Sequence, residues 1–193
     1  MSLPKTILIE GSNGSKEHNL NALHTADGVL FLTEPITAEI AVQFVSVMKY
    51  LKAEEKEVSI YLSCNGGEVN ARLVMYDVIQ SYPHKLNIIY TGMAASMAAV
   101  LLAGGQKGRR FILPHSKVMI HEPLIMNGFG GSATTIEKTA QSILETKSVI
   151  NNILAEATGK TVEEINLATA CDNVMNAEEA VAFGICDEIG NIY

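Results

Sequence analysis

Residues 86–106 read LNIIYTGMAASMAAVLLAGGQ and contain no charged side chain. The run is long enough to be compared with a membrane span, but alanine fills its centre where leucine or isoleucine is typical in lipid. Leu86–Thr91 has the composition of a buried strand, and Ser96–Ala103 that of a buried helix ending at Gly104-Gly105. The stretch therefore predicts a strand, a turn of small residues and a helix in a buried setting, and no membrane span.

The same order of strand and helix recurs on both sides of this stretch. Further strands are predicted at residues 28–33, 58–63, 110–113, 117–121 and 185–189, and helices at about 37–51, 69–81 and 134–157. Thr134 with Glu137, and Thr161 with Glu164, have the spacing of capping boxes, and Asn176 can cap a short helix. The alternation predicts an α/β fold with largely parallel strands. We expect residues 1–27 to form an irregular N-terminal arm and residues 28–193 to form one domain.

Composition limits the classes of partner. The chain has 193 residues, a net charge of −7, 48% hydrophobic and 18% charged residues, which is more apolar material than one small domain needs and favours self-association. The acidic balance, with its one small basic cluster at residues 107–110, argues against nucleic acid as a partner. Three widely spaced cysteines predict neither a disulfide framework nor a zinc site, and no apolar leader opens the chain, so we expect a cytoplasmic protein.

Ser96 stands where the turn of small residues meets the predicted helix. A serine there lies at the positive end of the helix dipole, beside free N–H groups that can stabilise an oxyanion. A serine N-cap is the commoner reason for this position, and the position alone leaves both readings open. The loop Cys64-Asn-Gly-Gly67 also joins a strand to a helix, so the N–H groups of Gly67 and Met97 could together form an oxyanion hole, although a plain turn would use the same glycines.

A nucleophilic serine needs a base and an orienting carboxylate. Of the five histidines, His121 ends an apolar strand where its ring can enter a cleft, and a buried structural histidine is the alternative. Of the four aspartates, Asp172 lies in a predicted loop between two helices, and spacing gives it only a weak preference. The remaining histidines and aspartates are His18, His24, His84, His115, Asp27, Asp77 and Asp187. We find no Walker A sequence, no G-x-S-x-G elbow and no metal-ligand spacing.

Four segments in the same order resemble motifs of the Clp protease proteolytic subunit (ClpP) family. Gly92–Ala98 resembles its G-Q-A-A-S-M-G segment, and Val118–Leu124 resembles V-M-I-H-Q-P-L. Residues 107–116 resemble the K-G-K-R and L-P-N-S segments, and Cys171–Ala180 resembles R-D-x-F-x-S-A-x-E-A. The similarity runs from about Gly28 to Ile189.

The resemblance implies a crotonase-like α/β fold with a long handle helix from Thr134. It implies Ser96 as nucleophile, His121 as general base and acid and Asp172 as orienting carboxylate, with the N–H groups of Gly67 and Met97 as oxyanion hole. It also implies two stacked seven-membered rings of identical chains that cut unfolded polypeptides in an enclosed chamber. A separate AAA+ ATPase would supply substrates and use the ATP, so no cofactor, metal, nucleic acid or membrane is expected to bind this chain.

The chain also departs from the family pattern. The usual S-P-G-G loop reads Cys64-Asn65-Gly-Gly67, which removes a rigid proline. Met93 and Ala98 replace Gln and Gly beside Ser96, Cys171 stands in place of an arginine, and residues 125–131 form a longer segment than usual. Two alternatives therefore stand beside the peptidase: a non-catalytic or partner-activated ring subunit, and a crotonase-type acyl-CoA enzyme whose oxyanion hole binds an enolate.

Overall fold

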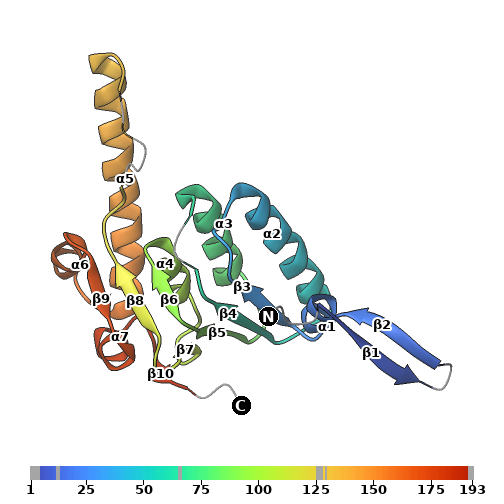
Figure 1. Ribbon diagram of the computed structural model, residues 1–193. Helices are drawn as coiled ribbons and strands as arrows, with labels where there is room; N and C mark the ends of the chain where they lie inside the picture. Colours follow the sequence, from blue (N-terminus) through green and yellow to red (C-terminus); the bar gives the residue numbers. More distant parts are fainter. Residues whose placement is uncertain (1–4, 12–13, 65–66, 125–127, 129, 191–193) are drawn as a thin grey trace.

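A parallel sheet forms the centre of the molecule (Figure 1). The computed structural model describes residues 5–11, 14–64, 67–124, 128 and 130–190. Within these residues the sheet has the strand order β10-β7-β5-β4-β3, and every neighbouring pair is parallel. The strands are β3 (Val29–Leu32), β4 (Val58–Leu62), β5 (Leu86–Tyr90), β7 (Arg110–Ile112) and β10 (Glu188–Ile189). The predicted α/β fold with largely parallel pairing is confirmed.

Three helices that pack on this sheet follow directly from their sequences. They are α2 (Ala38–Ala53), α3 (Val69–Gln80) and α4 (Met97–Ala103). The hydroxyl of Thr37 caps α2 by accepting from the N–H of Ile40 at 3.3 Å. The buried face of α2 consists of Ala41, Phe44, Met48 and Leu51, as the 3.6-residue period predicts.

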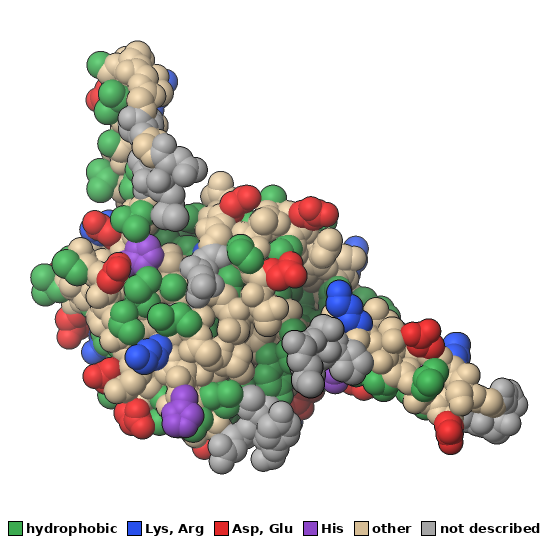
Figure 2. Space-filling view, viewed as in Figure 1, with side chains coloured by type: hydrophobic (Ala, Val, Ile, Leu, Met, Phe, Trp, Pro, Cys, Tyr) green, Lys and Arg blue, Asp and Glu red, His purple; other side chains and the backbone are tan. Residues whose placement is uncertain are grey.

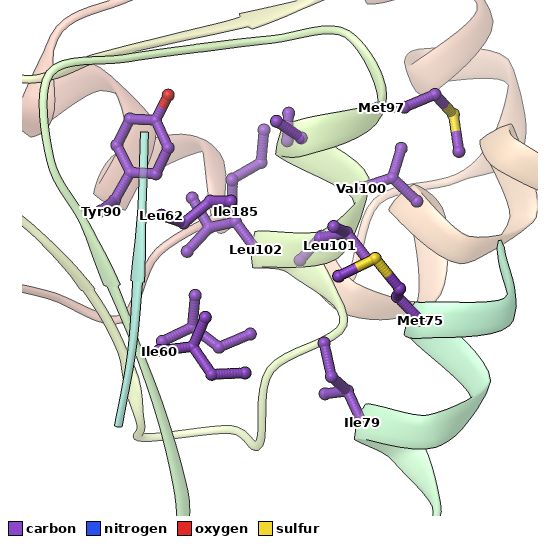
Figure 3. Close-up of a cluster of buried hydrophobic side chains, with 14 of the residues drawn as sticks. Ile60, Leu62, Met75, Ile79, Tyr90, Met97, Val100, Leu101, Leu102 and Ile185 are labelled. Atoms are coloured by element: carbon purple, nitrogen blue, oxygen red, sulfur yellow. The ribbon is translucent and has the colours of Figure 1, made fainter. Parts of the chain in front are cut away.

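All seven residues of α4 are buried, which explains the uncharged stretch. Its side chains pack with Met75 and Ile79 of α3 and with Ile60 and Leu62 of β4 (Figure 3). Strand β5 is buried on both faces, as is usual for a parallel strand covered by helices on either side. A buried strand and helix therefore account for residues 86–103, and within the described ranges we find no helix with the length and apolar character needed to cross a membrane.

A second, smaller sheet lies beside the first and was not predicted. It consists of β6 (Met93–Ala95), β8 (Lys117–Ile120) and β9 (Asn173–Met175) in the order β6-β8-β9. Strand β6 runs parallel to β8, and β9 runs antiparallel to it. We expected residues 93–95 to be a turn and residue 172 to lie in a simple loop between helices. Three-residue strands carry too little periodicity to be found in a sequence, and only their tertiary pairing defines them.

Two elements project from the body of the molecule (Figure 1). Helix α5 (Ala133–Thr158) has 26 residues, which corresponds to about 39 Å of helix, and its buried residues lie only at positions 150–155. Its N-cap is Ser132, whose hydroxyl accepts from the N–H of Thr135, so the predicted capping box at Thr134 is wrong. On the other side, β1 (Thr6–Gly11) and β2 (Gly14–Asn19) form an antiparallel hairpin followed by α1 (Leu20–Ala26), where we had expected irregular chain.

The C-terminal part follows the predicted caps. Helices α6 (Val162–Thr169) and α7 (Ala177–Phe183) each begin with a complete capping box, formed by Thr161 with Glu164 and by Asn176 with Glu179. Gly159 and Gly184 end helices α5 and α7 with φ of 75° and 96°. The predicted last strand is shorter than expected, because only residues 188–189 pair with β7. The division into an arm and a domain at residue 28 stays a prediction.

Candidate active site

Backbone pairing in the small sheet brings the three predicted triad positions to one end. Ala95 pairs with Met119 in the parallel register of β6 and β8, and Ile120 pairs with Asn173 in the antiparallel register of β8 and β9. Ser96 follows Ala95, His121 follows Ile120, and Asp172 precedes Asn173. Since β9 runs opposite to the other two strands, all three residues lie at the same end of this sheet. The pairing unites segments that are about 25 and 50 residues apart in the chain.

The backbone of Ser96 is strained. It has φ 62° and ψ −125°, a conformation that residues other than glycine rarely adopt. Its own N–H donates to the carbonyl of Met119 at 2.8 Å, and the N–H of Ala95 donates to the carbonyl of Cys64 at 3.4 Å. Ser96 occupies the N-cap position of α4, but its hydroxyl makes no capping hydrogen bond. The N-cap reading that the sequence left open therefore does not describe this serine.

His121 continues strand β8 away from the core. Val118 and Ile120 are buried on the core side of the strand, so alternation places Met119 and His121 on the other side. The Nδ1 atom of His121 is buried and has no hydrogen-bond partner among the described residues, and Asp172 is exposed. Neither Ser96 nor Asp172 is hydrogen-bonded to the His121 ring within the described ranges. The structure thus brings the three residues to neighbouring positions but does not connect them by hydrogen bonds.

Two backbone N–H groups proposed for the oxyanion hole make no hydrogen bond to a described residue. The N–H of Met97 belongs to the first residue of α4, which has no acceptor within its helix. The N–H of Gly67 makes no hydrogen bond to a described residue, while its carbonyl accepts from Nη1 of Arg72 at 3.2 Å. Gly67 has φ 150°, and a Cβ atom there would lie 2.3 Å from the carbonyl oxygen of Ile36. Only glycine fits this close approach, so the loop needs glycine for steric reasons whatever its chemistry.

The other aspartates and histidines have different surroundings. Asp187 forms a bidentate ion pair with Arg110, with oxygen–nitrogen distances of 2.5 and 2.9 Å. Burial alone raises the pKa of the Asp187 carboxyl, but the hydrogen bonds and charge of Arg110 outweigh it and lower the pKa. His115 is exposed as expected, and His24 and His84 pack edge-on against the rings of Phe31 and Tyr82. His18 lies in the hairpin strand β2, Asp27 ends α1, and Asp77 is exposed on α3.

Several features around the site were not predicted from the sequence. Glu122, next to His121, forms an ion pair with Lys147 of α5 at 2.5 Å, and its N–H donates to the carbonyl of Thr169 at 2.9 Å. Arg72 is fully buried in the first turn of α3. Its position gave a signal, because a cation in the first turn of a helix opposes the helix dipole. The Glu122–Lys147 pair joins residues far apart in the chain and had no sequence signal.

The departures noted in the sequence occupy different surroundings. Met93 is 42% exposed beside the site, whereas Ala98 is fully buried in α4, where a glycine would also fit. Cys171 is exposed next to Asp172. Asn65 and residues 125–127 and 129 of the longer segment lie outside the described residues.

Comparison with known families agrees with the fold. The model of the family described as "Clp protease" matches residues 12–192, which is nearly the whole chain. The match includes all three strands of the small sheet, the loop at Gly67 and helix α5. Its extent accounts for the ClpP-type arrangement of a parallel sheet, a small second sheet and a projecting helix. The chain belongs to the Clp protease family of peptidases.

Proposed function

We propose that this peptidase is a serine endopeptidase with Ser96 as nucleophile, His121 as general base and acid, and Asp172 as orienting carboxylate. The observation that carries the proposal is Ser96 itself. It starts a helix in a strained conformation, makes no cap, and lies at the same sheet end as the other two residues. Strained backbone at a helix start, with unpaired N–H groups beside it, is typical of a serine presented to a substrate carbonyl.

The proposed reaction proceeds through an acyl-enzyme. The Ser96 hydroxyl attacks the peptide carbonyl carbon while its proton passes to Nε2 of His121. The N–H groups of Gly67 and Met97 stabilise the oxyanion, and the imidazolium then gives its proton to the leaving amine as the C–N bond breaks. Water, deprotonated by His121, releases the acyl group in the second half of the cycle. The chain supplies all of these groups, so no metal or cofactor takes part.

Asp172 acts in this mechanism only after a local rearrangement. The buried Nδ1 of His121 has no hydrogen-bond partner in the described part of the chain, and that is the atom to which an orienting carboxylate binds. Hydrogen bonds of a catalytic site are often long or misaligned before substrate binds and tighten in the complex. The exposed Asp172 side chain begins one residue from β9, in register with His121, and a change of rotamers on these two side chains is the movement that the mechanism requires.

Assembly into two stacked rings of identical chains is part of the proposal. The part of α5 before residue 150 has no buried residue, yet it carries Ile136, Leu144 and Val149, which are 46%, 60% and 45% exposed. Figure 2 shows apolar side chains along this projection. A projecting helix of this kind gains stability only by packing against other chains. We further propose unfolded polypeptides as substrates, delivered by an AAA+ ATPase in the cytoplasm, where reducing conditions suit three cysteines that form no disulfide among the described residues.

Activity-based labelling tests the nucleophile directly. A fluorophosphonate probe should label the purified chain at Ser96, and Ser96→Ala should remove the label. Ser142→Ala, a change on the exposed face of α5, is the matched control and should label like the unmodified protein. His121→Ala and Asp172→Asn should each slow labelling by at least 100-fold. Labelling that persists in Ser96→Ala would refute the assignment, and native mass spectrometry of the same samples would establish the number of chains in each ring.

A partner-activated or non-catalytic ring subunit is the second candidate, and the unpaired Nδ1 of His121 is the observation that favours it. Either kind of chain would stay unlabelled when pure. A partner-activated chain would become labelled when mixed with a second ring subunit, whereas a non-catalytic chain would stay unlabelled in the mixture as well. Labelling of the pure chain with one probe molecule per chain would exclude this candidate.

A further inference from the structure

Arg72 is a buried cation without a counter-ion. Its side chain is 0% exposed, and it forms no ion pair with a carboxylate among the described residues. Its Nε atom is buried and has no hydrogen-bond partner within the same ranges. Burial lowers the pKa of the Arg72 guanidinium to about 10, and the position in the first turn of α3 adds an unfavourable interaction with the helix dipole. An apolar side chain would avoid all of these costs, so the guanidinium calls for an explanation.

The hydrogen bonds of the Arg72 guanidinium to described residues go to Gly67 and Cys64. Nη1 donates to the carbonyl of Gly67 at 3.2 Å, and Nη2 lies 3.9 Å from the thiol sulfur of Cys64. One guanidinium therefore contacts both ends of the loop 64–67. The thiol of Cys64 in turn donates to the carbonyl of Glu34 at 3.1 Å, so the loop is connected through Arg72 and Cys64 to the segment before α2.

The peptide group between Gly67 and Glu68 is held from two sides. Its carbonyl accepts from Arg72, and its N–H donates to the carbonyl of Ile36 at 3.0 Å. A Cβ atom on Gly67 would lie 2.7 Å from Nη2 of Arg72, so the guanidinium fills the space on that side of the glycine. Since the loop reads Cys-Asn-Gly-Gly, its own sequence supplies no rigid residue. These two contacts fix the peptide group that follows Gly67 and so anchor the glycine, whose own N–H makes no hydrogen bond to a described residue.

We infer that Arg72 is a positioning residue of the oxyanion site: it anchors Gly67, the residue whose N–H is the proposed oxyanion donor. The inference rests on the proposed function of Ser96 and Gly67. The link to the nucleophile is short, because the carbonyl of Cys64 also accepts from the N–H of Ala95, the residue before Ser96. Arg72 itself contacts neither substrate nor Ser96 in this arrangement, and it acts only through Gly67.

The test compares Arg72→Met and Arg72→Lys with the unmodified chain, using a fluorogenic peptide and a peptide boronic acid that mimics the tetrahedral intermediate. Loss of one oxyanion donor lowers kcat by about 100- to 1,000-fold, and a misaligned Gly67 should give Arg72→Met a loss of at least about 10-fold with KM changed less than about 2-fold. Affinity for the boronic acid should fall by the same factor as kcat/KM. Arg72→Lys keeps a charge but cannot contact both loop ends, and it should show a smaller loss of the same kind.

Two controls separate positioning from general stability. Arg110→Met removes another buried arginine, one that pairs with Asp187, and it should lower thermal stability without changing the affinity of the folded protein for the boronic acid. Millimolar methylguanidine should restore part of the activity of Arg72→Ala by occupying the vacated space, and it should not restore Arg110→Ala. If Arg72→Met fails to assemble, Arg72→Lys and the methylguanidine experiment carry the test.

The failure of this inference differs from the failure of the proposed function. An unmodified chain that fluorophosphonate labels neither alone nor in a mixture with a second ring subunit would refute the serine peptidase. An unmodified chain that is labelled, together with Arg72 variants that keep kcat and boronic acid affinity, would refute only the role of Arg72. If the Arg72 variants are less stable but their folded fraction keeps its affinity for the boronic acid, Arg72 has a structural role only.

Discussion

Replacing Ser96 by glycine and by alanine separates the cost of its backbone from the loss of its hydroxyl. The observed φ of 62° and ψ of −125° mirror an ordinary extended conformation, which glycine adopts without strain and alanine does not. A residue held in such a region costs about 1 to 3 kcal/mol. Glycine gives back about 0.5 to 1 kcal/mol through the greater freedom of its unfolded chain. We therefore expect Ser96→Gly to be more stable than Ser96→Ala by about 0.5 to 2 kcal/mol.

The measurement is thermal or denaturant unfolding of both variants at one protomer concentration, because assembly makes the midpoint depend on concentration. For a chain of this length, each kcal/mol corresponds to about 2 to 4 °C in Tm. Glu55, which has φ 54° in an exposed turn after α2, provides the matched pair of variants. Glu55→Gly should likewise be more stable than Glu55→Ala, and both should still be labelled at Ser96. If Ser96→Gly is no more stable than Ser96→Ala while the Glu55 pair behaves as expected, residue 96 is not strained and the argument from its conformation fails.

Three further predictions concern stability. Asp187→Asn should lower the free energy of unfolding by about 3 to 5 kcal/mol, because it leaves the buried Arg110 unpaired. Since the pKa of Asp187 is lowered in the folded state, this difference in stability should be present above about pH 4 and shrink as the pH falls through the folded pKa. Unfolding measured from pH 7 to pH 3 would show this. Thr161→Ala should cost about 1 kcal/mol by removing the cap of α6, and an NMR titration should show the lowered pKa of Glu164 moving back toward its ordinary value. Arg72→Met should be at least as stable as the parent in the same unfolding assay. Removing the buried charge relieves a cost of about 3 kcal/mol, which equals or exceeds the loss of about 1 to 3 kcal/mol from the hydrogen bond to Gly67. A clear loss of stability would contradict this.

Periodicity and caps were sufficient to predict the main sheet and its helices. Strand β5 has the apolar run that burial on both faces requires, and the caps at Thr37, Thr161 and Asn176 define helix starts to the residue. The cap of α5 was misplaced by two residues because Ser132, Thr134 and Thr135 can all serve as caps and only the fold chooses among them. The hairpin of β1 and β2 was missed because its exposed strands bury no apolar face.

The candidate site was harder to predict from the sequence than the fold, because it depends on short strands that only tertiary pairing defines. Ser96 could be identified from its strand–turn–helix context, but its distance in sequence from His121 and Asp172 gave no reason for the three to meet. That reason is the register of β6, β8 and β9, of which only β8 had a readable pattern. The family resemblance supplied the assignment that spacing could not, and the backbone register now gives it a structural basis.

The local rules of protein structure are broken at Ser96, at His121 and at Arg72 of helix α3. Ser96 adopts a backbone that glycine would occupy without strain, and Arg72 buries a charge in the wrong end of a helix. His121 keeps a buried ring nitrogen without a partner. A glycine at residue 96 and an apolar side chain at residue 72 would each relieve a cost of kcal/mol size, in a protein class whose whole stability is about 5 to 15 kcal/mol. Glu55 also has a positive φ, and Tyr90 and Asn151 also bury a side-chain atom without a hydrogen-bond partner within the described ranges, so the argument for the proposed active site rests on the strain at Ser96 together with its place in the small sheet.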